Sequence, residues 1–459
     1  MASDCFETFQ LESRCLIKSS KRIFAKEYVD EGIPFLRSKD VIDKSLGVFS
    51  NYDLFISRER YNELKKSYGS PVKGDLLISS VGNRSGLPYV VQDEGDFYFK
   101  DGNIIWISDF KNLDSNFLAH WFKSDIGQSR LASVMIGSAQ KALTINSIRT
   151  LTVSFPNFKA QQEIAHILGS IDSKIEINRQ MNETLEEIAQ ALFKSWFIDF
   201  DPVIDNALEA GNSIPDELFD RAERRKKIKQ NENNHAIRSL FPDELEFTRE
   251  MGWIPKGWGV TPVYEVADFI NGSSFKSQYF SDVKEALPIV KIAEIKNGVS
   301  EQTKFTTQKM AEKYAINDGD ILFSWSGNPD TSIDTFIWTG GKGWLNQHIF
   351  NVVLHKDSDK TFVYYLLKCL KPIFTEIARD KQTTGLGHVT VKDMKRIYTI
   401  KPPVEVLEAF GLYSNSIFEK WYQNLFSSKE LAKLRDTLLP KLISGEIRIP
   451  EAEALVEDV

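Results

Sequence analysis

Two long stretches of the chain repeat apolar residues at a seven-residue spacing. Sustained apolar a and d positions predict coiled-coil helices rather than ordinary surface helices. In residues 160–200 the a positions are Ile164, Ile171, Asn178, Leu185 and Leu192, and the d positions are Ile167, Lys174, Met181, Ile188 and Ser195. In residues 403–445 the a positions are Phe410, Ile417, Asn424, Leu431 and Leu438, and the d positions are Tyr413, Lys420, Ser427, Leu434 and Lys441.

Both helical stretches place polar residues at matching positions of this frame. Asn178 and Asn424 occupy the same a position, and Lys174 and Lys420 occupy the same d position. A polar residue at an a position costs stability but fixes register and partner choice. The match predicts two helices of about 60 Å that pair antiparallel with each other, at about 1.5 Å per residue. Two unrelated amphipathic helices are the alternative interpretation.

The chain also repeats itself outside the helices. GDLLISSVGN (74–83) returns as GDILFSWSGN (319–328), and KALTINSIRTLTVSFP (141–156) matches the pattern of GHVTVKDMKRIYTIKP (387–402). IPFLRSKDV (33–41) faces LPIVKIAEI (287–295) at a similar separation. Self-similarity of this kind is the signature of a repeated structural unit. The sequence therefore predicts two copies of one module, each followed by a long helix.

Each module mixes strand and helix patterns. DLLISSV, FYFKDGNIIWI (97–107) and LTVSF (151–155) are rich in β-branched and aromatic residues, which is typical of strands. Residues 116–135 and 362–379 favour helix, and Pro372 is expected to end or kink the second one. An α+β fold with a pseudo-two-fold internal repeat follows. The predicted segments are 1–158, 159–200 (helix), 201–257 (an irregular linker with a short helix near 216–230), 258–402, 403–445 (helix) and 446–459 (tail).

Composition narrows the class of protein. The chain has 459 residues, 42% of them hydrophobic, and a formal net charge of −7. The two modules each carry a slight net positive charge, whereas the helical and linking segments carry a net negative charge. Such an asymmetry of charge is relevant to the kind of partner that each segment binds. The 3 cysteines lie far apart, so neither a disulfide framework nor a cysteine zinc site is expected. Neither a signal peptide nor a membrane span is visible, and a cytoplasmic protein is the simplest interpretation.

Catalytic signatures are missing, whereas two kinds of polar loop recur. The chain has no P-loop, HExxH, GxSxG or GxGxxG motif, and its histidines lack metal-ligand spacing. One loop follows the GD…GN strand. The other is IGSAQKALT (136–144), which faces RDKQTTGLGHVT (379–390). Small polar residues suit contacts to phosphates and base edges, although structural turns explain both loops as well. His348 and His388 are loop or strand-edge candidates for polar contact.

Two segments carry a family resemblance, QQEIAHILGSIDSKIEINRQMNETLEEIAQALFKSWFIDFDPV (161–203) and LRDTLLPKLISGEIRIP (434–450). Through them the chain resembles the specificity (S) subunits of type I restriction–modification enzymes. The first segment is similar to their central conserved region and the second to their C-terminal one. GWIPKGW (252–258) is similar to the segment that opens their second half. One departure is Ala160, where the family usually has Glu.

The resemblance implies two target recognition domains, 1–158 and 258–402, joined by antiparallel conserved helices. Each domain is expected to read one half of a split, asymmetric double-stranded DNA target. The helices are expected to set the spacing and to recruit two methyltransferase (M) subunits and restriction/translocase (R) subunits. S-adenosylmethionine, ATP and Mg²⁺ are expected on those partners. The chain itself is expected to bind no cofactor or metal and to carry no catalytic residue.

The paired loops supply the candidate DNA-binding residues. Arg with guanine, and Asn or Gln with adenine, are the geometrically favoured pairs. In the first module the candidates are Arg37, Lys39, Asn83, Arg84, Ser85, Gln140 and Lys141. In the second they are Lys291, Ser326, Asn328, Lys381, Thr383, Thr384 and His388. Two other classes of function stay open: a coiled-coil adaptor with two protein-binding modules, and a nuclease or fused methyltransferase.

Overall fold

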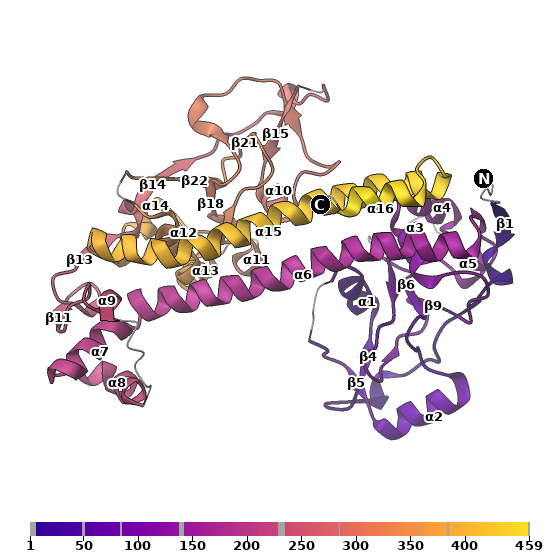
Figure 1. The fold of residues 1–459 in the computed structure, drawn as a ribbon, viewed down its shortest axis with the longest axis horizontal. Helices are drawn as coiled ribbons and strands as arrows, with labels where there is room; N and C mark the ends of the chain where they lie inside the picture. Colours follow the sequence, from indigo (N-terminus) through magenta and orange to yellow (C-terminus); the bar gives the residue numbers. More distant parts are fainter. Residues whose placement is uncertain are drawn as a thin grey trace. The chain divides into compact units, whose positions relative to one another are not determined.

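A computed structural model describes residues 6–47, 51–82, 85–136, 142–227, 235–283, 285–356, 358–382 and 385–457. The chain divides into two compact units. Unit 1 is Met1–Arg179 with Ser427–Val459, and unit 2 is Gln180–Phe426. Both units mix helices and strands, as the α+β prediction requires (Figure 1).

Among its described residues, unit 1 contains two four-stranded sheets and a separate strand pair. The first sheet orders β2 (Leu16–Lys18), β9 (Ile104–Ser108), β6 (Leu76–Ser79) and β7 (Pro88–Val90), and the second orders β3 (Tyr28–Val29), β5 (Phe55–Ile56), β4 (Ile33–Leu36) and β8 (Tyr98–Phe99). The separate pair is β1 (Glu7–Gln10) with β10 (Thr152–Phe155). The strands predicted around 76, 98, 105 and 153 are therefore confirmed.

The helices of unit 1 cover these sheets. They are α1 (Ser38–Ser45), α2 (Arg58–Tyr68), α3 (Ser115–Lys123), α4 (Asp125–Val134) and α5 (Ile145–Arg149). The single helix predicted over 116–135 was wrong, because the chain turns at Ser124. That residue is extended, with ψ 158°, and its hydroxyl accepts the Gly127 N–H at 3.1 Å, which starts a new helix.

Unit 2 repeats the plan. One sheet orders β14 (Ala267–Asn271), β22 (Ile349–Leu354), β18 (Ile321–Ser324) and β20 (Asp334–Ile337), and the other orders β16 (Phe305–Thr306), β15 (Leu287–Val290), β21 (Gly343–Leu345) and β17 (Ala315–Ile316). Strand pairs join β13 (Gly259–Pro262) to β24 (Tyr398–Lys401), and β19 (Ser326–Gly327) to β23 (Gly387–His388). The helices are α10 (Ile292–Asn297), α11 (Pro329–Ser332), α12 (Lys360–Cys369), α13 (Lys371–Asp380) and α14 (Val391–Met394). Pro372 lies in the first turn of α13, so the predicted helix does end before it.

Equivalent backbone hydrogen bonds confirm the repeat. The Leu143 N–H donates to the Ser80 carbonyl at 2.9 Å in unit 1, and the Val389 N–H donates to the Trp325 carbonyl at 2.8 Å in unit 2. β4 pairs parallel with β8, and its counterpart β15 pairs parallel with β21. The short sequence matches thus mark one topology that is built twice.

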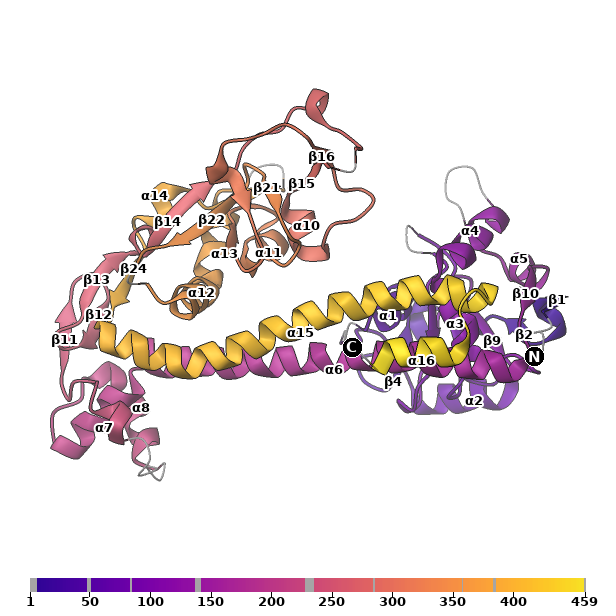
Figure 2. The ribbon, with the colours of Figure 1, turned by 45° about the horizontal axis from the view of Figure 1, so that its top comes forward.

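Two long helices run through both units, α6 (Phe158–Phe197) and α15 (Val404–Ser444). In unit 1, Asp172 accepts from Arg435 at 2.8 Å and Asn178 donates to Ser427 at 3.4 Å. In unit 2 the rings of Phe193 and Phe410 lie 6.0 Å apart. Residue numbers rise on one helix as they fall on the other, so the helices run antiparallel within each unit (Figures 1 and 2).

The predicted heptad frame was right for its a positions and for two of its d positions, Ile167, which is buried, and Leu434, which packs on the core of unit 1. It was wrong for several other d positions. Lys174 and Lys420 are exposed, and Met181 and Ile188 are 38% and 50% exposed. The second packed row lies four residues after each a position and includes Leu168, Asn182 and Ala189, which are all buried. Both rows of α6 are partly apolar, so the pattern alone did not separate them.

The segment 201–257 is not the irregular linker that was predicted. It forms α7 (Asp201–Ala210), α8 (Phe219–Lys226), α9 (His235–Arg238), and a hairpin of β11 (Leu245–Thr248) and β12 (Gly252–Pro255). Only the short helix near 216–230 was anticipated. Buried Asp201 and Asp205 on α7 pair with Arg221 and Arg225 on α8. Burial alone would raise the pKa of Asp201, but the hydrogen bonds from Arg221 and Ser195 outweigh it and lower that pKa.

The C-terminal segment is likewise part of the folded structure rather than a tail. It forms α16 (Ile449–Glu457), whose Ala452 is fully buried and whose Val456 is almost so. The Lys174 ammonium of α6 donates to the Val456 carbonyl at 3.2 Å. Both buried side chains belong to the apolar core of unit 1.

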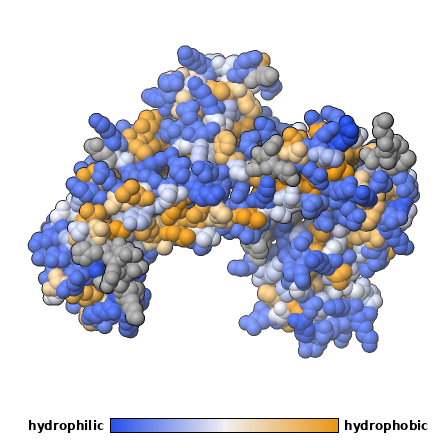
Figure 3. All heavy atoms as spheres, viewed as in Figure 1, coloured by the Kyte–Doolittle hydropathy of each residue, from blue (hydrophilic) through white to orange (hydrophobic). Residues whose placement is uncertain are grey.

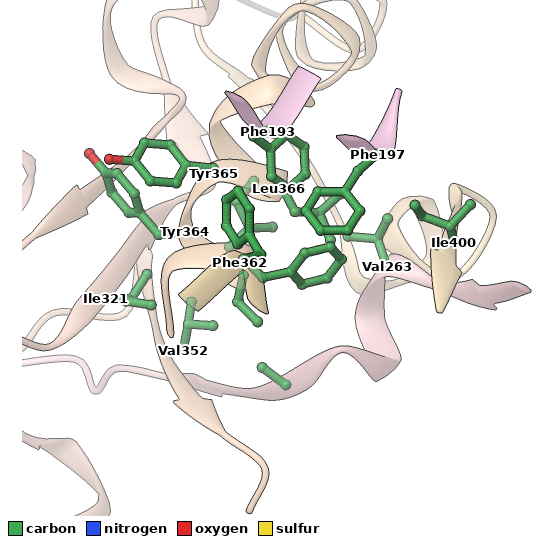
Figure 4. Packing of buried hydrophobic residues seen from close by; sticks show 14 of the residues in the cluster. Phe193, Phe197, Val263, Ile321, Val352, Phe362, Tyr364, Tyr365, Leu366 and Ile400 are labelled. Atoms are coloured by element: carbon green, nitrogen blue, oxygen red, sulfur yellow. The ribbon is translucent and has the colours of Figure 1, made fainter. Parts of the chain in front are cut away.

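The core of unit 2 joins its module to the long helices through aromatic residues. Phe193 and Phe197 project from α6 toward Phe362 of α12 (Figure 4), with ring centroids 5.6 and 5.0 Å away. Beside them, Tyr364 packs on Phe418 at 5.8 Å. Edge-to-face aromatic contacts add to the free energy of area burial, so this module is held firmly on its helices.

At the equivalent place, unit 1 has a cleft of about 960 Å³. By position in the repeat, Ala119 replaces Tyr364 and Asp172 replaces Phe418. His120 and Lys123 of α3, with Arg435 of α15, also line the cleft. The small and polar residues leave open the space that unit 2 fills with rings.

Candidate nucleic-acid interface

In unit 2, the ends of several strands meet at one place, called edge 2 here. The Asn346 N–H donates to the Val290 carbonyl at 3.0 Å, which joins the end of β15 to the β21–β22 connection. The Trp325 N–H donates to the His348 carbonyl at 3.4 Å, which adds the end of β18. The residues of edge 2 are Asn271, Lys291, Trp325, Ser326, Asn346, Gln347, His348 and His388.

Unit 1 builds a matching edge 1 from the equivalent strand ends. The Lys100 N–H donates to the Leu36 carbonyl at 2.9 Å, and the Ser80 N–H donates to the Asn103 carbonyl at 2.9 Å. Edge 1 comprises Arg37, Ser80, Lys100, Gly102 and Asn103. The backbone is arranged alike at both edges, whereas every side chain pair between them differs. A repeated scaffold with unlike side chains suits the recognition of two different sequences.

Lys291 and Arg37 occupy equivalent places at the starts of α10 and α1. Each backbone N–H donates to the acidic residue three positions on, Glu294 at 3.0 Å and Asp40 at 2.7 Å, in a matching capping box. One guanidinium nitrogen of Arg37, Nη2, also donates to both carboxylate oxygens of Asp53, at 2.6 and 2.8 Å. Lys39 is exposed on the first turn of α1. The structure thus places Arg37 and Lys291 on the two edges.

Ser326 and His388 come together as partners in the β19–β23 pair. The two loops that the sequence singled out therefore touch in unit 2. Asn328 serves as the N-cap of α11 and accepts the Asp330 and Thr331 N–H groups, both at 3.1 Å. Its side-chain oxygen accepts these bonds, so its side-chain NH₂ group remains for other contacts.

Lys381 forms an ion pair with Asp393, which also accepts from Thr390 at the end of the same loop. Burial alone would raise the pKa of Asp393, but the hydrogen bonds from Lys381 and Thr390 outweigh it and hold that pKa below its ordinary value. Ser85 is half-buried, with its hydroxyl 3.9 Å from the Met135 sulfur. The remaining candidates lie outside the described residues: Asn83, Arg84, Gln140, Lys141, Thr383 and Thr384.

Sequence reasoning missed Asn271, Trp325 and Gln347 of edge 2. Asn271 and Gln347 are exposed, and Trp325 is half-buried. They come from three separate strand ends, and only the pairing order of β14, β22 and β18 brings them together. The only signal available was the repeat itself, because Trp325 sits inside the repeated GD…GN stretch.

Several lysines of unit 2 lie near Asp334 and helix α11. Lys368 and Lys371 approach Asp334 at the start of β20, at 3.2 and 2.6 Å. Burial alone would raise the pKa of Asp334, but the two lysines outweigh it and lower that pKa. Burial lowers the pKa of nearby Lys296, whose ammonium donates to the Thr331 carbonyl. This group carries more cations than anions, which favours an anionic partner.

The fold and the two unlike edges define a chain with duplicated recognition modules on a pair of long helices. A family described as "Type I restriction modification DNA specificity domain" matches residues 4–187 and 255–406. The chain belongs to this family, as a specificity subunit of type I restriction–modification systems. The family match occurs twice, in agreement with the internal repeat.

Known relatives match along most of the chain. It is 27% identical over 451 residues to the type I restriction enzyme HindI specificity subunit of Haemophilus influenzae, with 90% of this chain and 94% of that protein covered. It is 28% identical over 444 residues to the MjaIX specificity subunit of Methanocaldococcus jannaschii, with 93% and 89% covered.

A solved structure shares the fold. The type I restriction–modification S subunit from M. genitalium aligns with a TM-score of 0.53 at 14% identity, over 96% of this chain and 97% of that one. Within the residues described here, no helix has the length and apolar character to cross a membrane. The same residues contain no His, Cys, Asp and Glu grouping suited to hold a metal ion.

Proposed function

We propose that unit 1 and unit 2 each read one half of a split, asymmetric DNA target. The observation that carries this proposal is the duplicated edge, with the same backbone hydrogen bonds and different side chains. Unlike readers on one chain suit a target whose two halves differ. Specific recognition of DNA depends on hydrogen bonds to base edges, while phosphate contacts supply position and affinity. The net charge of −7 is compatible with this division if partner subunits contribute phosphate contacts.

The long helices set the separation of the half-sites and recruit the partners. The surface over the second half of α6 shows apolar side chains (Figure 3). In that stretch Met181 and Ile188 are 38% and 50% exposed, and Ile198, just after the end of α6, is 42% exposed. Exposed apolar rows of this kind mark protein–protein contacts. We assign this row to the docking of the methyltransferase subunits, which carry S-adenosylmethionine. Restriction subunits with ATP and Mg²⁺ then join, and this chain contributes recognition rather than catalysis.

A methylome tests the proposal. The chain is co-expressed with the methyltransferase subunit of the same system in a host without adenine methylation, and methyladenine is mapped by single-molecule sequencing. A motif with two defined halves and a fixed gap is expected. An assembled complex without any motif would support the adaptor function instead. A continuous motif would mean that only one unit reads DNA.

A further inference from the structure

The side-chain amide of Gln347 on edge 2 contacts the neighbouring imidazole. Its Nε2 lies 3.3 Å from Nε2 of His348, and both side chains are exposed. An amide nitrogen donates and cannot accept, so the imidazole nitrogen accepts in this contact. The contact uses one of the two N–H groups of Gln347. One N–H and the carbonyl oxygen stay available, side by side.

The imidazole of His348 is itself positioned by its neighbours. Its ring centroid lies 5.7 Å from that of Trp325. The Trp325 indole N–H donates to the side-chain oxygen of Asn271 at 3.0 Å. His348, which contacts Gln347, is therefore supported by residues from the ends of β14 and β18. Fixing a polar side chain before binding reduces the entropy lost when it binds.

We propose that Gln347 reads an adenine in the half-site bound by unit 2, an inference that rests on the proposed function. Adenine presents a ring-nitrogen acceptor and an exocyclic amino donor side by side in the major groove. The available N–H and carbonyl oxygen of Gln347 match that pair. Guanine presents two acceptors there, so the Gln347 carbonyl would face another acceptor. His348 and Trp325 are positioning residues for this contact.

The proposal is confined to unit 2 because edge 1 lacks the arrangement. Gly102 and Asn103 stand at the positions of Gln347 and His348. Gly102 has no side chain with which to read a base. The carbonyl of Asn103 accepts the Ser80 N–H and the Ser38 hydroxyl, which ties this backbone into the sheets. The first half-site is therefore read by other groups, and it serves as an internal reference.

Substitutions at Gln347 test the inference in the assembled complex with its methyltransferase subunit. In Gln347→Ala, discrimination for adenine at one position of the second half is expected to fall about 10- to 100-fold. In Gln347→Glu, the carboxylate only accepts, and the same position is expected to shift toward cytosine, whose amino group donates. His348→Ala is expected to keep the adenine preference and lower the methylation rate. The first half stays unchanged in all three.

Gln308→Ala is the matched control. Gln308 follows β16 and lies toward the opposite end of β15 from Lys291, because Thr306 pairs with Leu287. It is expected to leave both halves unchanged. Unaltered motifs in both Gln347 variants would overturn the inference, as would a second half that contains no adenine. A wild-type complex without a split motif would instead contradict the proposed function.

Complete loss of methylation in a Gln347 variant would call for a binding measurement. The purified variant complex is titrated with duplexes that carry the wild-type first half and each of the four bases at the adenine position. For Gln347→Ala, equal affinity for all four bases supports the inference, and for Gln347→Glu, a preference for cytosine does. A retained preference for adenine contradicts it.

Discussion

At the scale of single residues, two asparagines show how polar side chains are accommodated in the largely apolar contact between α6 and α15. The Asn424 amide donates to the Asn182 side-chain oxygen at 2.9 Å, and Asn182 donates to the Trp421 carbonyl at 3.1 Å. Both side chains are buried. The sequence predicted Asn424 at the seam but missed Asn182, which lies in the unpredicted row. Satisfied buried amides fix the register between α6 and α15 within unit 2.

Replacement of Asn424 leaves the side-chain oxygen of Asn182 without the donor that the Asn424 amide provides. Asn424→Leu is expected to cost about 1–3 kcal/mol, because a buried amide loses its hydrogen bond. The double variant with Asn182→Leu is expected to lie near the wild type, since neither polar group then remains. Urea denaturation of the single and double variants measures this coupling. Additive losses in the double variant would contradict it.

His120 makes the stability of unit 1 sensitive to pH. Burial lowers its pKa from 6.5 to about 4, with Lys123 and Arg435 adding to the effect and Asp172 opposing it. A histidine whose pKa is lowered on folding stabilises the fold above pH 6.5 and loses this contribution as pH falls toward 4. The expected loss is about 3 kcal/mol over that range. His120→Gln keeps a polar side chain but does not titrate, so its unfolding free energy is expected to fall less between pH 7 and 4.5. Parallel pH profiles for the two proteins would exclude the role of His120.

At the scale of elements, the two modules differ in how they meet the long helices. Unit 2 fills the junction with Tyr364, Phe418 and Trp421, whereas unit 1 leaves a cleft of about 960 Å³ there. The repeat in the sequence does not reveal this difference, because it aligns the elements rather than the side-chain volumes. We therefore expect the two units to differ in local stability.

Truncation of Tyr364 is expected to create a cavity in unit 2 at the place where unit 1 has its cleft. Tyr364→Ala is expected to cost about 3–5 kcal/mol, the usual range for the loss of a buried aromatic ring. Ala119→Phe, at the equivalent position of unit 1, has room in the cleft and is expected to be nearly neutral. Urea denaturation of both variants tests the pair. A Tyr364→Ala variant with wild-type stability would show that the aromatic cluster does not hold the module.

The limits of prediction are clearest in the helices and the linker. The strands near 76, 105 and 153 followed from β-branched and aromatic runs, and the break at Pro372 followed from proline chemistry. The second seam row did not follow, because Met181 and Ile188 are as apolar as the buried residues around them. The α7–α8 pair also escaped prediction. It is held by Asp201 with Arg221 and Asp205 with Arg225, contacts across a loop that local propensity does not report.

At the scale of the whole molecule, duplication is the property that bears on function. Each unit has its own core, its own edge and its own halves of α6 and α15. The recognition modules are therefore expected to exchange independently of the helices. Edge residues such as Gln347 lie entirely within the segment 258–402, so a module carries its specificity with it.

A chimera tests this independence. Residues 258–402 are replaced by the corresponding segment of the Haemophilus influenzae HindI specificity subunit, and the methylome is mapped again. The first half of the motif is expected to persist, because edge 1 is untouched. The gap is expected to persist as well, because α6 and α15 are unchanged, while the second half is replaced. A matched chimera of residues 1–158 should alter only the other half. A change in both halves, or in the gap, would mean that the modules read DNA jointly. Neither half of the motif could then be assigned to one unit alone.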